Sequence, residues 1–425
     1  MIRSKVGPRE VPFIYNLFPP LAGEAAGWMA HVKRAAKMGF NWIFLNPIQY
    51  PGESGSIYSI RDYDRLNPLF FPQGSMEEQF AAFQSFIEAS RAAGMEVMVD
   101  LVINHTAHDS PLLKEHPQWF KWLADGTIAH PGAMDNGHWV LWGDLAEIDN
   151  ANSPDKSGLY GYWWQRMKEM LDRGVRGFRC DAAYKVPLPL WRLLIGRARE
   201  EAPDAVFFAE TLGCPFEDNL ALTEAGFDFT FNSGKWWNYR DDWFLHQLRD
   251  GCGRTRSISF PESHDTERLM EEFRGDVPRV EQHYAFTALI ASGVMIVLGF
   301  EYGFRKRPHV VKTRPGDWEG ISDDLTEFIA RVNALKVARR LFQEDNSVER
   351  VEIGTENVLA LKKTALDGKE SAALLLNRYG HKHTVSAGGL AKAISFRNAE
   401  ALVGAFTRQE DAFVLDPWAL ILLEP

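Results

Sequence analysis

The sequence predicts an α/β protein: a closed (β/α)8 TIM barrel with an insertion after its third strand, followed by a C-terminal antiparallel β domain. Short apolar runs alternate with helical patterns between residues 11 and 341, and together they form eight successive units. Several of these runs are apolar on both faces, which is typical of parallel strands covered by helices. Eight strand–helix units are the number that closes such a barrel.

The first three predicted strands are separated by helices whose ends are marked in the sequence. We expect strands at 11–17, 40–45 and 95–103, and helices at 28–38 and 80–93. Gly39 and Gly94 follow the two helical patterns, as glycines commonly do at helix C-termini. Ser75 and Glu78 precede the second helix with the spacing of a capping box.

Residues 106–157 interrupt this alternation. They are rich in His, Pro, Gly, Asp and Trp and show no clear period, so they predict a functional loop or a small inserted domain. The alternation then returns. Its strands are expected at 175–180, 206–210, 227–232, 257–260 and 294–298, and its helices at 158–173, 190–200, 236–248, 284–291 and 324–341.

After residue 344, short strands separated by turn residues replace the strand–helix rhythm. They are expected at 348–353, 358–362, 372–376 and 420–423, which predicts an antiparallel β-sandwich in series with the barrel. We therefore divide the chain into a barrel (1–105 and 158–344), an inserted domain (106–157) and a C-terminal β domain (345–425).

The composition narrows the classes of function. Apolar residues make up 45% of the 425 residues and charged residues 24%, which is ordinary for a globular enzyme. The net charge of −10 disfavours nucleic acid or an anionic membrane as the main partner. Three cysteines without metal-ligand spacing make a disulfide framework unexpected. Neither a signal peptide nor a membrane-spanning run is visible, so we expect a cytoplasmic location.

Polar residues stand where the predicted strands end. These residues are Asp100 and His105, Arg179 and Asp181, Glu210, and Glu262, His264 and Asp265. In a barrel, the carboxyl ends of the strands form the active site. Acidic and imidazole groups at four such ends are unexpected for core positions, so they predict a catalytic site there.

One of these strand ends contains a cation and a carboxylate two positions apart. Arg179 and Asp181 are expected to point to the same side of their strand, where the cation keeps the carboxylate ionised. An ionised carboxylate held in place can act as a nucleophile. A buried structural ion pair is the alternative interpretation of this segment.

Four segments of the chain resemble the signature regions of glycoside hydrolase family 13, the α-amylase family. They are 100–105 (Asp-Leu-Val-Ile-Asn-His), 177–183 (Gly-Phe-Arg-Cys-Asp-Ala-Ala), 208–210 (Phe-Ala-Glu) and 263–265 (Ser-His-Asp). Residues 55–63 resemble the family's loop after strand two. The resemblance covers nearly the whole chain, with 106–157 corresponding to the family's domain B and the C-terminal strands to its domain C.

The resemblance implies roles for individual residues. Asp181 corresponds to the family's nucleophile, Glu210 to its general acid/base and Asp265 to its transition-state stabiliser. Further substrate-binding positions are expected at Tyr58 (as a stacking platform), Asp100, His105, Arg179, Lys185 and His264. Each histidine could instead be a structural one. The chemistry agrees with these assignments, because retaining cleavage of a glycosidic bond needs one ionised and one protonated carboxyl group.

The chain departs from the family's pattern after Asp181. Many α-amylases carry a Lys-His pair that contacts the leaving-group side, where this chain has Tyr184 and Lys185. Asn104 matches a calcium ligand of many members, so it could hold calcium, but domain B ligands are not recognisable, and neither a metal nor a cofactor is predicted.

A basic run follows the eighth strand, at residues 305–309 and 312–319. Such a run is usually a solvated face, but at the catalytic rim of an acidic protein it could also hold an anionic group such as a phosphate. Its Lys-x-Arg-Pro-x-Asp-Trp portion is similar to a stretch of the family's bacterial maltosyltransferases, which use maltose 1-phosphate as donor.

The sequence therefore predicts a retaining enzyme that hydrolyses or transfers α-1,4-linked glucans or malto-oligosaccharides. Its expected partner is this sugar substrate, with no nucleic acid and no membrane, and nothing in the sequence indicates an oligomeric state. One alternative is a maltosyltransferase that uses a sugar 1-phosphate. Another is a glucan-binding protein without catalysis, which is disfavoured because all three carboxylates are present.

Overall fold

The structure, a computed structural model, describes residues 7, 9–135, 138–239, 241–251, 255–345 and 348–425. Within these residues eight parallel strands close a barrel in the order β1-β14-β13-β12-β11-β10-β5-β2. Their bounds are β1 Phe13–Asn16, β2 Trp42–Leu45, β5 Glu96–Leu101, β10 Gly177–Cys180, β11 Val206–Ala209, β12 Phe229–Phe231, β13 Arg256–Ser259 and β14 Gly293–Val297. The predicted barrel is confirmed.

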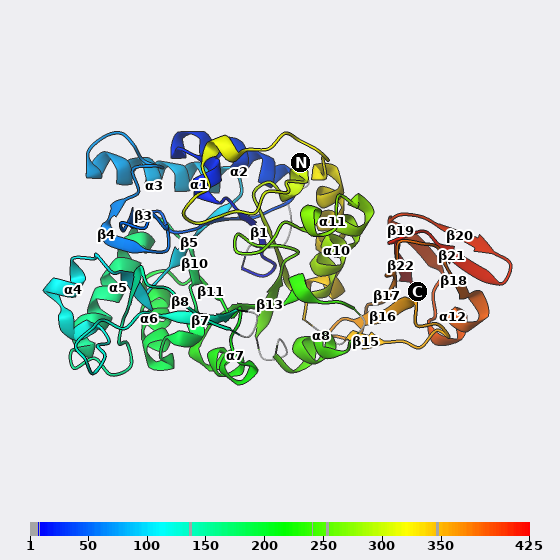
Figure 1. The fold of residues 1–425 in the computed structure, drawn as a ribbon. Helices are drawn as coiled ribbons and strands as arrows, with labels where there is room; N and C mark the ends of the chain where they lie inside the picture. Colours follow the sequence, from blue (N-terminus) through cyan, green and yellow to red (C-terminus); the bar gives the residue numbers. More distant parts are fainter. Residues whose placement is uncertain (1–6, 8, 136–137, 240, 252–254, 346–347) are drawn as a thin grey trace.

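Helices surround the strands (Figure 1). The longer ones are α2 Trp28–Lys37, α3 Met76–Ala92, α5 Lys156–Asp172, α6 Leu188–Glu201, α10 Val277–Ile290 and α11 Thr326–Ala338. The shorter ones are α1 Pro19–Ala22, α4 Leu112–Glu115, α7 Phe216–Leu222, α8 Trp243–His246 and α9 Leu269–Glu272, whereas α12 Ala387–Ala393 lies in the C-terminal part. Helix α3 begins with the predicted capping box, in which the Ser75 side chain accepts from Glu78 N and the Glu78 carboxylate accepts from Ser75 N.

Large apolar side chains fill the interior of the barrel. Phe208 and Phe229 lie opposite each other on β11 and β12 and stack with ring centroids 5.2 Å apart. Trp42 meets Phe208 edge-on, and Gly177 makes room for it, since a Cβ there would lie 2.6 Å from the indole. The interior is therefore a packed core, as the barrel architecture requires.

Three small antiparallel pairs extend beyond the barrel strands. They are β3 Gln49–Pro51 with β4 Ile60–Leu66, β6 His105–Ala107 with β9 Leu145–Glu147, and β7 Gly132–Asp135 with β8 His138–Leu141. The last two pairs lie within or at the start of the predicted insertion, whose bounds at 106–157 stay a prediction.

The C-terminal part forms two antiparallel sheets beside α10 and α11, coloured orange to red in Figure 1. The first contains β15 Val348–Arg350, β16 Val358–Thr364, β17 Ser371–Asn377, β22 Leu420–Glu424 and β19 Asn398–Val403, in this order. The second contains β18 His383–Ser386, β21 Ala412–Leu415 and β20 Phe406–Gln409. An apolar cluster that includes Leu375, Val385, Phe413 and Ile421 joins the two sheets.

One predicted helix is wrong in part. The pattern predicts a helix at 236–248, but the described residues between Trp237 and Asp242 are not helical, and α8 begins only at Trp243. Tyr239 has a φ of 60°, in the left-handed region that interrupts a right-handed helix.

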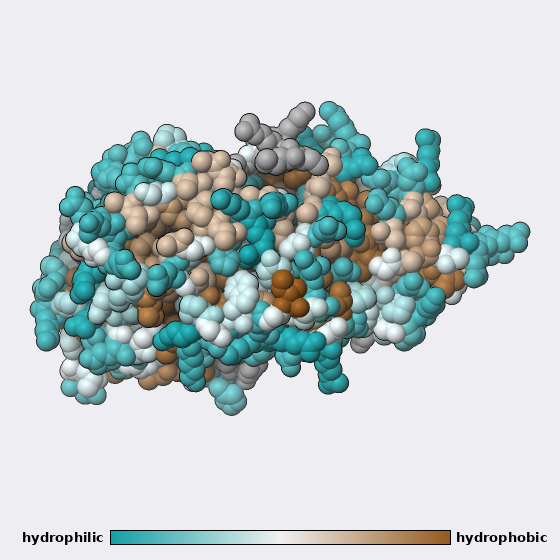
Figure 2. All heavy atoms as spheres, turned by 90° about the horizontal axis from the view of Figure 1, so that it is seen from above, coloured by the Kyte–Doolittle hydropathy of each residue, from teal (hydrophilic) through white to brown (hydrophobic). Residues whose placement is uncertain are grey.

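The surface seen in Figure 2 is mostly hydrophilic, with apolar patches between the charged side chains. Among the described residues, no helix is both long and apolar enough to cross a membrane.

Candidate active site

The proposed nucleophile and acid/base come from neighbouring strands of the barrel. Asp181 directly follows β10 and Glu210 directly follows β11. The parallel hydrogen bonding continues one residue past the strands, because Asp181 N donates to Leu101 O and Glu210 N donates to Cys180 O. Both side chains therefore emerge at the same level of the barrel's carboxyl end, where barrel active sites lie.

A buried guanidinium connects three carboxyl groups. Arg179 Nη1 donates to Asp181 Oδ1 at 2.6 Å and to the two Asp100 oxygens at 2.9 and 3.1 Å. Its Nη2 lies 3.9 Å from Glu210 Oε2. A hydrogen-bonded cation stabilises a carboxylate in its charged form, so this contact suits Asp181 as a nucleophile.

Glu210 has a different environment. Burial raises its pKa to about 7, and the charge of Asp181 acts in the same direction while that of Arg179 opposes it. Its oxygens accept backbone hydrogen bonds from Ala182 N at 2.9 Å and from Leu212 N at 2.5 Å. Neighbouring carboxyl groups in unequal environments can divide the roles of nucleophile and acid between them.

Asp100 has a supporting position in the site. Its side chain is fully covered, and burial raises its pKa to about 6. Besides Arg179, it accepts a hydrogen bond of 2.6 Å from the Tyr58 hydroxyl. Asp100 therefore orients Arg179 and Tyr58, and its contact with substrate stays a prediction.

Tyr58 and His264 form a stacked pair beside Asp265. Their rings are nearly parallel with centroids 5.7 Å apart, and the Tyr58 hydroxyl lies 2.8 Å from His264 Nε2. His264 Nε2 also lies 3.0 Å from Asp265 Oδ2. The Asp265 side chain is about half exposed, and its partial desolvation acts to raise its pKa. The contact with His264 and the charges of Arg179 and Arg307 outweigh this effect, so the pKa is lowered. Asn46, which directly follows β2, donates a hydrogen bond of 2.9 Å to the Tyr58 hydroxyl. Sequence reasoning missed this residue.

His105 and Lys185 contact backbone carbonyl groups rather than hydrogen-bonding the three carboxylates. His105 is buried with Nε2 3.2 Å from Tyr58 O, and burial lowers its pKa. Lys185 Nζ donates to Gly132 O in β7 and lies 4.8 Å from the centre of the Trp142 ring. Lys185 thus fastens the β7–β8 hairpin to the segment after Asp181.

Asn104 is buried, and its carboxamide oxygen and nitrogen have no hydrogen-bond partner in the structure. Calcium binds six to eight oxygens, usually with several carboxylates among them. Among the described residues, no group of three or more His, Cys, Asp or Glu side chains comes together as a metal site.

A small hollow lies among the predicted site residues. Its lining contains Arg179, Glu210, His264 and Asp265 on the polar side, with apolar walls from Phe44, Leu212, Phe231, Phe260 and Met295. Ser263 completes it. The arrangement combines carboxyl groups, an imidazole and a guanidinium in a confined space, which suits the cleavage of a polar, uncharged bond such as an acetal.

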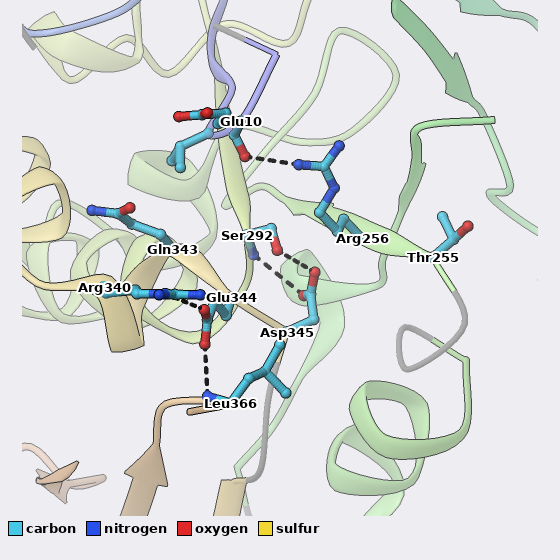
Figure 3. Close-up of a pocket in the computed structure, with 10 residues that line it drawn as sticks. Glu10, Thr255, Arg256, Ser292, Arg340, Gln343, Glu344, Asp345 and Leu366 are labelled. Carbon is cyan, nitrogen blue, oxygen red and sulfur yellow. Dashed lines mark hydrogen bonds and ion pairs between the residues drawn. The ribbon is translucent and has the colours of Figure 1, made fainter. Parts of the chain in front are cut away.

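A second cleft lies at the opposite end of the barrel strands, against the C-terminal part (Figure 3). Its lining includes Glu10, Arg256, Arg340, Glu344 and Asp345. The Asp345 carboxylate accepts hydrogen bonds from the backbone and hydroxyl groups of Ser257 and Ser292. These bonds hold the start of the C-terminal part to the barrel, and the cleft contains none of the predicted site residues.

Comparisons with known proteins match this architecture. The sequence model described as "Glycogen debranching enzyme, glucanotransferase domain" matches residues 13–120. An α-amylase from Lactobacillus plantarum superposes with a TM-score of 0.78 at 22% identity, covering 98% of this chain and 99% of that one. The α-glucosyl transfer enzyme XgtA superposes with a TM-score of 0.77 at 15% identity, covering 99% of both chains. These structures share the fold.

Two curated relatives are also similar in sequence. The α-1,4-glucan:maltose-1-phosphate maltosyltransferase of Burkholderia pseudomallei is 24% identical over 87% of this chain and 33% of its own length. That of Mycolicibacterium smegmatis is 25% identical over 82% of this chain and 54% of its own length. The chain thus spans between a third and about half of these relatives. With the barrel, these similarities show that the chain has the fold of the α-amylase family, glycoside hydrolase family 13, and homologues among its glycosyl hydrolases and transferases.

Proposed function

We propose that the chain is a retaining enzyme that acts on α-1,4-linked glucans or malto-oligosaccharides through a covalent glycosyl-aspartate. The observation that carries this proposal is the arrangement around Arg179, which hydrogen-bonds Asp181 and lies beside Glu210. The pKa of Glu210 is raised to about 7, so near neutral pH this residue can both donate and accept a proton. We include the predicted cytoplasmic location in this proposal, and cell fractionation tests it.

In the first step Asp181 attacks the anomeric carbon, and the bond between this carbon and the leaving oxygen breaks. Glu210 gives its proton to the leaving oxygen. Asp265 accepts and His264 donates hydrogen bonds at sugar hydroxyls, and His105 contributes a further contact to the bound sugar. The products of this step are a glycosyl ester of Asp181 and an ionised Glu210.

In the second step the Glu210 carboxylate removes a proton from water or from a sugar hydroxyl. The resulting oxygen attacks the anomeric carbon from the face that the leaving group vacated, and the ester bond to Asp181 breaks. Two inversions give net retention. Water produces hydrolysis, whereas a sugar acceptor produces transglycosylation.

The test is product analysis with maltodextrin, combined with NMR of the first anomer formed. We expect the α-anomer from the native protein, and a loss of turnover of several orders of magnitude in Asp181→Asn and Glu210→Gln. Native turnover in either variant, or a β-anomer as the first product, contradicts the proposal. Binding of maltodextrin without any product would instead favour a non-catalytic glucan-binding protein.

A second candidate is the transfer of a maltosyl unit from a sugar 1-phosphate to an α-glucan. Two observations favour it. The curated relatives carry the name of such an enzyme. The basic run also reaches the site, because Arg307 Nη2 donates to Asp265 O at 2.7 Å. Val310, between the two parts of the run, accepts a hydrogen bond from Ile57 N, next to Tyr58.

Incubation with maltose 1-phosphate and glycogen separates the two candidates. Elongation of the glucan with release of one phosphate per maltosyl unit supports transfer from the phosphate donor. If neither elongation nor phosphate release occurs while maltodextrin is converted, this second candidate is rejected.

A further inference from the structure

The segment 263–267, which carries Asp265, is stabilised locally by its own side chains. Ser263 N donates to Thr266 Oγ1 at 3.0 Å, and Asp265 N donates to Ser263 Oγ at 3.2 Å. These bonds define the turn after β13. They do not fix where the turn lies relative to the neighbouring strand ends.

Two cations from the adjacent barrel loops hold this segment from both sides. Arg307 follows β14, and its Nη2 donates to Asp265 O at 2.7 Å while its Nη1 lies 3.2 Å from Glu267 Oε1. Lys235 follows β12, and its Nζ donates to Glu267 O at 3.3 Å. Strands β12 and β14 are the two neighbours of β13 in the barrel, so the contacts come from opposite directions.

We propose that Arg307 is a positioning residue for Asp265. Together with Lys235 it fixes the position of the segment 263–267 relative to the neighbouring strand ends. This inference rests on the proposed function, in which Asp265 stabilises the transition state. The guanidinium holds the backbone of Asp265, while the Asp265 carboxylate stays available for the sugar.

The need for such a contact follows from the exposure of Asp265. About half of its side chain (51%) is exposed, and its ion-pair partner in the structure is His264, at 3.0 Å. A group that stabilises a transition state has to be held within about 0.5 Å of its productive position. A misplacement of about 1 Å can lower the rate roughly 100-fold. The backbone contact from Arg307 restricts this movement.

The test compares Arg307→Gln with a matched control, Arg192→Gln. Both arginines are about half-exposed (54% and 52%), and each contacts one carboxylate and one backbone carbonyl. Arg192 lies on α6, and its contacts are with Glu224 rather than with a predicted site residue. For Arg307→Gln we expect a fall in kcat of roughly 10-fold to 100-fold, a KM within about twofold and a melting temperature like that of Arg192→Gln.

A double-mutant cycle with Asp265→Asn separates positioning from a general structural role. With an activated aryl α-maltoside as substrate, we expect Arg307→Gln to have little further effect in the Asp265→Asn background, because both changes remove the same contribution. We expect Arg307→Lys to be more active than Arg307→Gln, because lysine keeps the positive charge. It lacks the two guanidinium nitrogens that contact Asp265 O and Glu267 together.

Three outcomes overturn the inference: a kcat for Arg307→Gln equal to that of Arg192→Gln, full additivity with Asp265→Asn, or a loss explained by unfolding in both Arg307 variants. The proposed function fails separately, if Asp181→Asn stays active. An inactive Asp181→Asn together with a fully active Arg307→Gln rejects only the positioning role.

Discussion

Arg179 and Asp181, two positions apart in the sequence, are joined by a hydrogen bond of 2.6 Å. This contact is possible because residues i and i+2 of a strand point to the same face. The same guanidinium bonds Asp100 on β5 and lies 3.9 Å from Glu210 after β11. One buried cation therefore organises groups from three neighbouring strands.

Replacing this cation should destabilise the protein as well as inactivate it. We expect Arg179→Met to lower the free energy of unfolding by about 3–5 kcal/mol, because it leaves the buried Asp100 carboxyl without its partner. Urea unfolding measures the change. Arg192→Gln, on an outer helix, should change the free energy of unfolding by less than about 0.5 kcal/mol. Equal values for the two variants would contradict the supporting role of Arg179.

The raised pKa of Glu210 predicts a pH dependence. The acid form donates the proton in the first step, so kcat/KM for maltodextrin should fall as pH rises through about 7, tenfold per unit above it. A pH–rate profile measures this limb. With an α-glycosyl fluoride the leaving fluoride needs no proton, so the limb should be weaker or absent. The prediction is wrong if both substrates show the same limb.

Much of the barrel and its carboxylate-bearing strand ends could be predicted from local patterns. Apolar runs flanked by helical periodicity define the strands, and Asp181 and Glu210 directly follow two of them. These features depend on residues close in sequence. The capping box of Ser75 and Glu78 is of the same kind, since it links positions three apart.

Contacts between distant segments could not be predicted in this way. The contact of Arg307 with Asp265 joins loops 42 positions apart, and that of Lys185 with Gly132 joins segments 53 positions apart. Both depend on how barrel loops pack against each other. Tyr239 interrupts a predicted helix through its backbone conformation, which the apolar pattern does not report.

Lys185 should affect substrate binding through the β7–β8 hairpin. Lys185→Met removes the hydrogen bond to Gly132 O and the cation that faces Trp142. We expect faster hydrogen exchange at residues 138–141 and a higher KM for maltodextrin, with kcat within about twofold, because uniform binding is weakened rather than transition-state binding. Lys168→Met, on α5, is the control. A large fall in kcat with normal exchange would show that Lys185 acts on the reaction directly.

A buried lysine connects the C-terminal sheet to the barrel. Lys363, on β16, donates from Nζ to Leu289 O, Ile290 O and Glu344 O at 3.1, 2.8 and 2.8 Å, and two of these acceptors lie at the C-terminus of α10. Replacing Lys363 by an apolar residue would leave these buried carbonyl groups without their hydrogen-bond donor. Each unsatisfied group costs about 1–3 kcal/mol.

We therefore expect Lys363→Met to lower the free energy of unfolding by about 1–3 kcal/mol or more, and to lower the melting temperature clearly. The neighbouring Lys362 is exposed on the same strand, so Lys362→Met changes the same residue type without touching α10. Thermal unfolding of both variants, followed by intrinsic fluorescence, provides the comparison. Because the Lys363 contacts involve none of the predicted site residues, a Lys363→Met protein should keep its KM at temperatures below the transition. If Lys363→Met melts like Lys362→Met, the three carbonyl contacts do not hold the C-terminal sheet to the barrel.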